Sequence, residues 1–244
     1  MIRVASYNMR KAIGTDRRRR PERTIEVLNE LGADVVALQE ADRRFGSRAS
    51  AIPFEMLEAH SDYEPVEIDN RPGSVGWHGN ALLVRKGLEV REHHLFHLPS
   101  LEPRGAVLAE IVIDGVLMRF VGMHLDLSGL WRRQQAQAIL SHLHEHDGSE
   151  PPTVLMGDLN EWSTHGGCLR DFGRDHDFAP CGRSFHARRP IAALDRIMVS
   201  RDLAVVASGV HRTACSRRAS DHLPIWAELS PIGTGGLGTR DWGT

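Results

Sequence analysis

The feature that constrains this chain most is a short apolar run that leads into closely spaced polar residues. Thr153–Met156 are followed directly by Gly157, Asp158, Leu159 and Asn160. A short apolar run bounded by a turn signal predicts a buried strand, and the glycine lets a neighbouring backbone approach closely. Because side chains alternate along a strand, we expect Asp158 and Asn160 on one side, where the sheet opens to solvent. The alternative is a turn in which both residues bond their own backbone.

Other segments of the chain have a similar character. Apolar or alternating residues predict strands over 2–8, 34–40, 80–84, 89–98, 106–113, 116–125, 194–199, 203–210 and 222–229. Ile25, Leu28 and Leu31 recur at helical spacing, which predicts a helix that begins at Pro21 and ends at Gly32. Further helices are expected over 54–60, over about 131–145, and as a short segment after residue 160.

The order of these elements indicates the fold class. Residues 2–40 form a strand–helix–strand unit, and Asp114-Gly115 is a strong hairpin signal between two strands. Hairpins mixed with a few helices predict an α/β sandwich of two sheets with helices outside. We expect one domain over residues 1–230 and a flexible, glycine-rich tail over residues 231–244.

Composition narrows the function classes. Of the 244 residues, 41% are hydrophobic, and no run approaches the roughly 18 apolar residues of a membrane span. No signal peptide is visible, and the three scattered cysteines favour a reducing compartment, so we expect a cytoplasmic protein. The net charge of −2 argues against non-specific binding of long nucleic acid, because such proteins carry a basic excess, and it leaves a local basic patch open.

Polar residues stand at the ends of most of the predicted strands. They are Asn8, Glu40, His124, Asp158, Asn160, Asp195 and the triplet Ser220-Asp221-His222. Each has a plain structural explanation: a turn residue, a solvated charge, a satisfied core histidine or a surface ion pair. Their shared position beside apolar strands favours one site in which all of them meet.

Five of these segments together resemble a known family. Ser6-Tyr7-Asn8, Leu38-Gln39-Glu40, Gly157-Asp158-Leu159-Asn160, Leu194-Asp195-Arg196-Ile197 and Ser220-Asp221-His222-Leu223-Pro224 are similar to the ordered motifs of the endonuclease/exonuclease/phosphatase superfamily, with its DNase-I-like fold. The resemblance spans residues 2–229 and is nearest to short bacterial members. It implies a four-layer α/β sandwich, with two packed mixed β-sheets flanked by helices, and Mg²⁺-dependent hydrolysis of a phosphate ester.

The resemblance also implies roles for the matching residues. Glu40 would be the principal Mg²⁺ ligand, with Asn8 and Asp221 nearby; Mn²⁺ is the alternative ion. Asp158 would orient or deprotonate the attacking water, assisted by Asn160. His222, held by Asp195, would contact the scissile phosphate, and His124 occupies a position where relatives place a residue against the phosphate.

The chemistry requires these residue types for reasons of its own. A phosphodiester is anionic, so a site needs positive charge against its oxygens, and Mg²⁺ prefers one or two carboxylates with waters and substrate oxygens. A free Asp is a weak base at neutral pH, so positioning and charge should supply most of the rate. A nucleophilic role for Ser220 is disfavoured, because the glycines of a hydrolase elbow are missing around it.

Basic residues are candidates for substrate contact. Arg183, Arg188 and Arg189 precede the strand that begins near Asp195, and Arg104 opens another strand. They would reach a second phosphate or a flanking group, although a solvated loop is nearly as good an interpretation. The run Arg17–Arg20 is interpreted as a solvated loop, with contact to a phosphate as the alternative.

The substrate remains open between three hypotheses. The chain departs from repair endonucleases after Glu40, with Ala41-Asp42-Arg43-Arg44, and after Asn160, with Glu161-Trp162-Ser163. We rank a phosphodiesterase of small or lipid-derived phosphodiesters first and a DNA or RNA nuclease second, since aromatics are only 6%. A non-catalytic binding module ranks third, because the full residue set is present.

Overall fold

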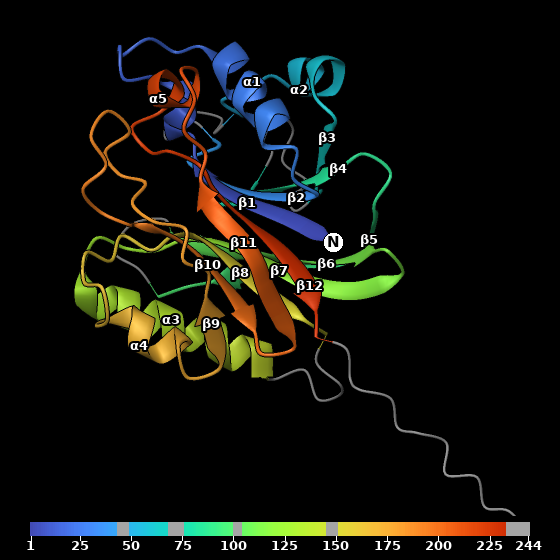
Figure 1. Cartoon of the computed structure of the whole chain (residues 1–244), viewed down its shortest axis with the longest axis vertical. Helices are drawn as coiled ribbons and strands as arrows, with labels where there is room; N and C mark the ends of the chain where they lie inside the picture. The colour runs from blue at the N-terminus through green and yellow to red at the C-terminus, as the bar shows by residue number, and fades with distance from the viewer. Residues whose placement is uncertain (43–48, 68–75, 100–103, 145–150, 233–244) are drawn as a thin grey trace, which may run out of the picture.

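In the computed structural model, residues 1–42, 49–67, 76–99, 104–144 and 151–232 are described. Within this part of the chain two six-stranded β-sheets pack face to face with helices on their outer faces (Figure 1). The four-layer α/β sandwich that the motifs implied is therefore confirmed. No helix among the described residues is both long and apolar enough to cross a bilayer.

The first sheet has the strand order β11-β12-β1-β2-β4-β3. Its strands are β1 (Ile2–Asn8), β2 (Val35–Gln39), β3 (Tyr63–Pro65), β4 (Ala81–Arg85), β11 (Leu203–Val210) and β12 (Ile225–Pro231). Strands β1 and β2 are parallel, whereas the other pairs of this sheet are antiparallel. Helix α1 (Pro21–Leu31) makes the crossover between β1 and β2.

The second sheet repeats this plan with the order β5-β6-β7-β8-β10-β9. Its strands are β5 (Glu89–His97), β6 (Gly105–Ile113), β7 (Val116–His124), β8 (Thr153–Asp158), β9 (His176–Phe178) and β10 (Asp195–Ser200). Strands β7 and β8 are its parallel pair, joined through helix α3 (Gly129–His144). Each sheet thus has a central strand–helix–strand unit, and ligands of α/β sheets bind beyond the carboxyl ends of such strands.

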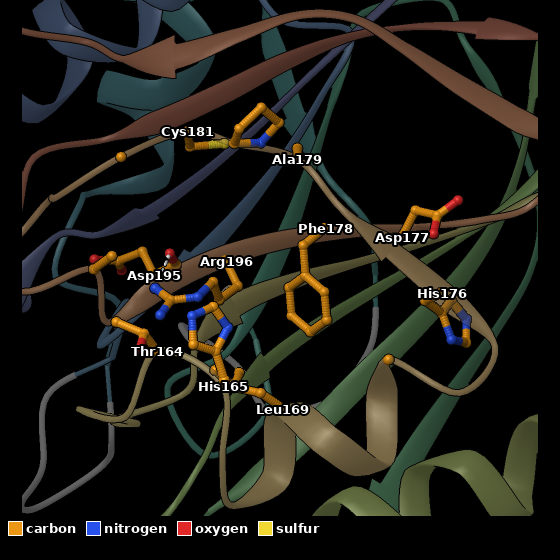
Figure 2. A pocket seen from close by; sticks show the side chains of 14 residues that line it. Thr164, His165, Leu169, His176, Asp177, Phe178, Ala179, Cys181, Asp195 and Arg196 are labelled. Carbon is orange, nitrogen blue, oxygen red and sulfur yellow. Dashed lines mark hydrogen bonds between the residues drawn. The ribbon is translucent and has the colours of Figure 1, made fainter.

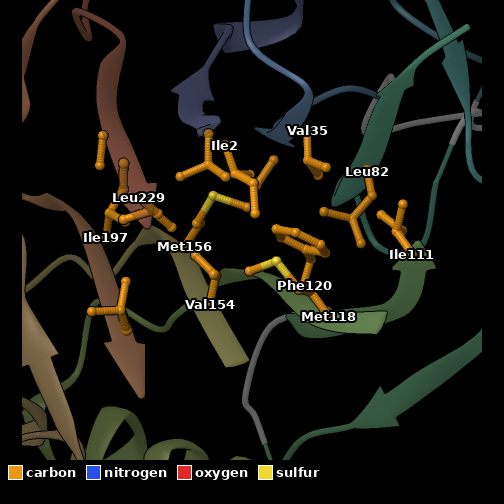
Figure 3. Packing of buried hydrophobic residues seen from close by; sticks show 14 of the residues in the cluster. Ile2, Val35, Leu82, Ile111, Met118, Phe120, Val154, Met156, Ile197 and Leu229 are labelled. Atoms are coloured by element: carbon orange, nitrogen blue, oxygen red, sulfur yellow. The ribbon is translucent and has the colours of Figure 1, made fainter. Parts of the chain in front are cut away.

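Three apolar clusters hold the layers together. The central one lies between the sheets, and Figure 3 shows Val35 and Leu82 of the first sheet facing Phe120 and Met156 of the second. Helices α1 and α2 (Phe54–His60) pack on the outer face of the first sheet. Helices α3 and α4 (Cys168–Phe172) pack on the outer face of the second sheet. Strands β1, β2, β7 and β8 are buried on both faces, which explains their nearly continuous apolar sequence.

Most sequence boundaries agree with the structure, and the differences have local causes. The predicted helix over 54–60 and strand over 203–210 match α2 and β11. Strand β2 ends at Gln39, because Glu40 adopts a left-handed backbone with φ 54°. Strand β12 begins only at Ile225, so His222 lies in the preceding loop. The expected helix end at residue 145 and the tail over residues 233–244 lie outside the described residues, while β12 extends to Pro231.

Candidate functional site

Four of the predicted site residues stand at strand ends on the faces between the sheets. They are Asn8 of β1, His124 of β7, Asp158 of β8 and Asp195 of β10, and all four are at least 94% buried. On β8, the side chain two residues before Asp158 is Met156, which belongs to the central core. Because side chains alternate along a strand, the polar row continues the apolar core layer at one end of the sandwich.

Asp158 lies at the centre of this group. Its Oδ2 accepts a hydrogen bond of 3.0 Å from Nδ2 of Asn8, which crosses from one sheet to the other. The same oxygen lies 3.5 Å from Nε2 of His124 and 3.7 Å from Nε2 of His222. Its Oδ1 accepts a hydrogen bond of 3.0 Å from the backbone N–H of Asn160. One carboxylate therefore joins residues from both sheets.

The His222 ring is held in a charged state by two carboxylates. Its Nδ1 lies 2.9 Å from Oδ2 of Asp195, which also accepts a hydrogen bond from the hydroxyl of Ser184. Burial alone would lower the pKa of His222, but the charges of Asp195 and Asp158 outweigh it and raise the pKa to about 10. The ring is therefore an imidazolium at neutral pH, with Nε2–H on the side of Asp158.

The His124 ring is held in the opposite state. Burial, with a further contribution from the neighbouring Arg104, lowers the pKa of His124 to about 3 and outweighs the attraction of Asp158. The neutral ring accepts a hydrogen bond of 2.7 Å at Nε2 from Nη1 of Arg104. The contact between His124 and Asp158 is therefore not an ion pair, although the atoms lie close.

The two remaining predicted carboxylates face outward beside this group. Glu40 is paired with the ammonium of Lys11, and Oδ2 of Asp221 lies 3.3 Å from Nε of Arg10. Both carboxylates are partly open to solvent, with side-chain exposures of 27% and 21%. Arg10 and Lys11 belong to a short 3-10 turn, η1 (Arg10–Ala12), that follows β1 directly. Two cationic groups thus gather at these carboxylates, which is the charge that a divalent cation would supply.

A second group of possible ligand atoms is less suitable for a metal. Atoms of Asp158, Asp195 and His222 lie within 4.8 Å of one another. The charges of Asp195 and Asp158 raise the pKa of His222, which favours the imidazolium, and an imidazolium has no free nitrogen lone pair. These three residues form one candidate group of ligand atoms, and Glu40 with Asn8 and Asp221 forms the other.

Asn160 and Ser220 anchor the backbone around the site. The strand already ends at Asp158, so alternation does not place Asn160; it adopts a left-handed φ of 49° instead. Its Nδ2 donates 2.9 Å to the carbonyl of Leu125, which ties the loops after β7 and β8 together. The hydroxyl of Ser220 donates 2.7 Å to the carbonyl of Asn8 and accepts from the N–H of His222. The turn expected at Ser220-Asp221-His222 is therefore present, and it lies within the candidate site.

The predicted substrate-binding arginines separate into two groups. Arg104 reaches the buried group through His124. Arg188 is exposed and donates 2.9 Å from Nη2 to the carbonyl of Thr15, outside that group. Arg183 and Arg189 are exposed in the same loop. Within the described part of the chain, no side-chain hydrogen bond joins either of them to the buried site residues.

Sequence reasoning did not single out several residues that surround the site. Lys11 pairs with Glu40, and Ser184 holds Asp195. The ring of Phe185 lies 4.9 Å from the ring of His222. Ser184 and Phe185 belong to the arginine-rich stretch that we noted for its charge alone, and a serine or phenylalanine in a loop carries no signal of its own.

Comparisons with known proteins agree with this arrangement. The chain matches the Endonuclease/Exonuclease/phosphatase family over residues 5–222. It is 29% identical over 164 residues to the uncharacterized protein YbhP of Escherichia coli K12, a match that spans 63% of each chain, less than two thirds of that relative's length.

Two solved structures share the fold. The endonuclease/exonuclease/phosphatase of Bacteroides vulgatus has a TM-score of 0.73 at 20% identity, over 94% of this chain and 98% of that one. The mannosyl-6-phosphatase Bt3783 of Bacteroides thetaiotaomicron has a TM-score of 0.73 at 21% identity, over 94% and 100%. With five sequence motifs, the four-layer fold and a family match over most of its length, the chain belongs to the endonuclease/exonuclease/phosphatase family.

Proposed function

We propose that this protein is a metal-dependent phosphoesterase that hydrolyses a phosphodiester by in-line attack of water. The observation that carries the proposal is the buried Asp158 carboxylate, which is fixed by Asn8 and flanked by a charged and a neutral histidine. A base, a fixed positive charge and hydrogen-bond donors around one point are what phosphoryl transfer to water requires. The phosphoesterase-type fold of the family supports the same reaction class.

The protein groups divide the work as follows. Asp158 orients the attacking water and accepts its proton, and the hydrogen bonds from Asn8 and from the Asn160 N–H fix that carboxylate. The imidazolium of His222 binds a non-bridging phosphate oxygen, and Asp195 keeps it protonated and aimed. His124 lies beside the same point as a neutral ring, with the guanidinium of Arg104 behind it.

The residues around Glu40 fit a Mg²⁺ ion, with Mn²⁺ as the alternative. Glu40, Asp221 and the amide oxygen of Asn8 offer the oxygen donors that Mg²⁺ prefers, and the two carboxylates already attract Lys11 and Arg10. When bound, the ion supplies positive charge against the phosphate oxygens. Asp221 lies next to His222 in the sequence, so the cation site and the phosphate-binding ring share one loop.

We favour a small or lipid-derived phosphodiester as the substrate, with a nuclease as the second candidate. Trp162 follows β8 and is 60% exposed, with its ring 6.0 Å from Phe185, which in turn contacts His222. Leu127, in the loop after β7, is 67% exposed. These exposed apolar side chains, on the loops that follow β8 and β7, suit a substrate with an apolar or ring-shaped group.

The cysteines support the expected cytoplasmic location. Cys168, Cys181 and Cys215 are free thiols. Burial raises the pKa of all three, that of Cys168 to about 11, so none is a reactive thiolate at neutral pH.

The test is hydrolysis by the wild-type protein with Mg²⁺ or Mn²⁺ and its reversal by EDTA. The panel contains a chromogenic phosphodiester, phospholipids, supercoiled plasmid and abasic-site duplex. It also contains mannose 6-phosphate, because one structural neighbour is named a mannosyl-6-phosphatase. We expect metal-dependent cleavage of the small diester or a lipid. Nicking of DNA alone would favour the nuclease, and no cleavage of any substrate would contradict the proposal and favour the non-catalytic module.

A further inference from the structure

Three arginine-bearing segments that are far apart in the sequence meet at Thr15. The Thr15 N–H donates a hydrogen bond of 3.0 Å to the carbonyl of Arg218, and the Thr15 hydroxyl donates one of 3.4 Å to the carbonyl of Arg217. The Thr15 carbonyl accepts the 2.9 Å hydrogen bond from Nη2 of Arg188. Figure 1 shows α5 (Ser216–Ala219) beside the chain that precedes α1. We call the resulting surface the arginine patch; it consists of Arg17, Arg18, Arg19, Arg20, Arg188, Arg189, Arg217 and Arg218.

The loop around Gly14 packs closely against α5 beneath the arginine patch. A Cβ on Gly14 would lie 2.3 Å from the carbonyl oxygen of Arg218, a contact that backbone cannot relieve. The Gly14 N–H donates 3.0 Å to the carbonyl of Arg18, which folds the loop back on itself. A glycine is required at this position, and it brings the run Arg17–Arg20 against α5.

The positive charge of the arginine patch is only partly balanced: Asp16, the acid of its loop, pairs with Arg23 and also interacts with Arg218. All eight side chains belong to exposed residues, and none forms an ion pair with a carboxylate among the described residues. The acid of this loop, Asp16, is held 2.7 Å from the guanidinium of Arg23, which lowers the pKa of Asp16. In a chain whose net charge is −2, so many like charges in one place repel one another unless an anion joins them.

The arginine patch adjoins the candidate site. The N–H of Ala187, next to Arg188, donates 2.7 Å to the carbonyl of Asp221. Arg218 precedes Ser220 by two residues, and Ser220 bonds both Asn8 and His222. The arginine patch therefore lies on segments that flank the loop of Ser220, Asp221 and His222. Arginine presents several N–H donors in a planar fork that matches phosphate oxygens.

We propose that the arginine patch binds a second phosphate group of the substrate, next to the scissile one. This inference rests on the proposed phosphoesterase function and narrows its substrate to compounds that carry more than one phosphate. The second phosphate belongs either to a compact polyphosphorylated molecule or to the next nucleotide of a strand. The recognition chemistry, which is guanidinium on phosphate, is the same for both.

The test measures binding without turnover. Fluorescence anisotropy follows a labelled oligothymidylate of about 12 nucleotides, in EDTA, over a salt series, and tripolyphosphate is the competing compact ligand. The patch variant is Arg18→Gln, Arg189→Gln and Arg217→Gln combined, one change in each segment. The control variant is Arg91→Gln, Arg170→Gln and Arg174→Gln combined. These exposed arginines lie on β5, in α4 and just after α4, and both elements lie away from α5 in Figure 1. Thermal melts confirm that both variants fold.

We expect the patch variant to bind the oligonucleotide, the tripolyphosphate or both at least about tenfold more weakly than the wild type. For the oligonucleotide, loss of contact with that one phosphate should also lower the magnitude of the slope of log affinity against log salt by about 0.7. Weakening of one probe alone identifies the source of the second phosphate. Unchanged binding, equal weakening in the control variant, or no binding by the wild type would overturn the proposal. This experiment measures binding and not catalysis. A protein that binds both probes but hydrolyses no substrate would therefore contradict the proposed function and leave the phosphate-binding proposal intact.

Discussion

Asp195→Asn is the substitution that tests the proposed site most directly. Asn has the shape of Asp but no charge, so the ring of His222 loses the carboxylate that holds it at 2.9 Å. Burial still disfavours the charged ring, and Asp158 at 3.7 Å becomes its main support. We therefore expect the pKa of His222 to fall from about 10 toward or below its ordinary value.

The size of the effect on activity follows from the protonated fraction. At pH 8 a group with a pKa of about 10 is about 99% protonated, whereas an ordinary histidine with a pKa of about 6.5 is about 3% protonated. If the reaction needs the His222 imidazolium, kcat/KM at pH 8 should fall roughly thirtyfold, and much less at pH 6. The alkaline limb of the pH profile should move from near pH 10 to near pH 6.5.

Stability supplies an independent readout with a defined sign. A histidine whose folded pKa is raised contributes stability that is complete below pH 6.5 and is lost as the pH rises through 10. Removal of one partner of a buried charged pair costs about 3–5 kcal/mol. The Asp195→Asn variant should therefore melt at a lower temperature than the wild type at pH 6, and the difference should shrink toward pH 10.

The assay is the pH dependence of kcat/KM on the substrate found in the panel, together with an NMR titration of the His222 ring. Ser184→Ala is the matched control, because it removes a hydrogen bond to the same Asp195 oxygen but keeps the charge. It should lower activity by no more than a few fold, without a shift of the alkaline limb. Superimposable pH profiles for folded Asp195→Asn and wild type would refute the reasoning.

Three further predictions concern the metal, the backbone and acid stability. Glu40→Gln and Asp158→Asn should each abolish turnover in a folded protein, but only Glu40→Gln should weaken Mg²⁺ binding in isothermal calorimetry. Turnover at the wild-type rate in either variant would contradict the proposed roles of Glu40 as metal ligand and Asp158 as base. Gly157→Ala should lower the free energy of unfolding by at least about 3 kcal/mol in urea titrations, because its Cβ would lie 2.0 Å from a backbone carbonyl oxygen of β7. Gly122→Ala is the control and should cost about 1 kcal/mol, because its Cβ would meet only side chains, at 3.2 Å or more. Equal costs for the two variants would contradict this prediction. Because the pKa of His124 is lowered to about 3, the free energy of unfolding should fall as the pH falls from 6.5 toward 3, by about 2 kcal/mol at pH 5. The His124→Gln variant should not show this pH dependence in denaturant titrations at several pH values.

The sequence predicted those parts of the fold that depend on local pattern. Pro21 and Gly32 define the two ends of α1, with Gly32 in the left-handed conformation that the prediction required. Asp114 and Gly115 both have positive φ in the β6–β7 turn, as an Asp-Gly hairpin demands. The polar residues at the strand ends were also predicted, because the five motifs occur in a fixed order and the strands before them are strongly apolar.

The parts that were not predicted depend on tertiary packing. Strands β3 and β9 have three residues each and α5 has four, so no periodicity can mark them. The state of each histidine depends on partners far away in the sequence: Arg104 for His124, and Asp195 for His222. The run Arg17–Arg20 is exposed, as predicted, but its position beside α5 was not predicted, because α5 is about 200 positions away in the chain.

The site depends on how the two sheets pack, because neither sheet contains it alone. The first sheet supplies Asn8 and leads to Glu40, whereas the second supplies Asp158. The hydrogen bond from Asn8 to Asp158 is a direct link between the sheets, and it lies at the end of the apolar layer that separates them. Since protein interiors are close-packed, the volume of core residues such as Phe120 and Met156 sets the sheet separation and thereby the distance between Glu40 and Asp158, the proposed metal ligand and the proposed base. A core substitution that changes the sheet separation should therefore reduce activity before it unfolds the protein.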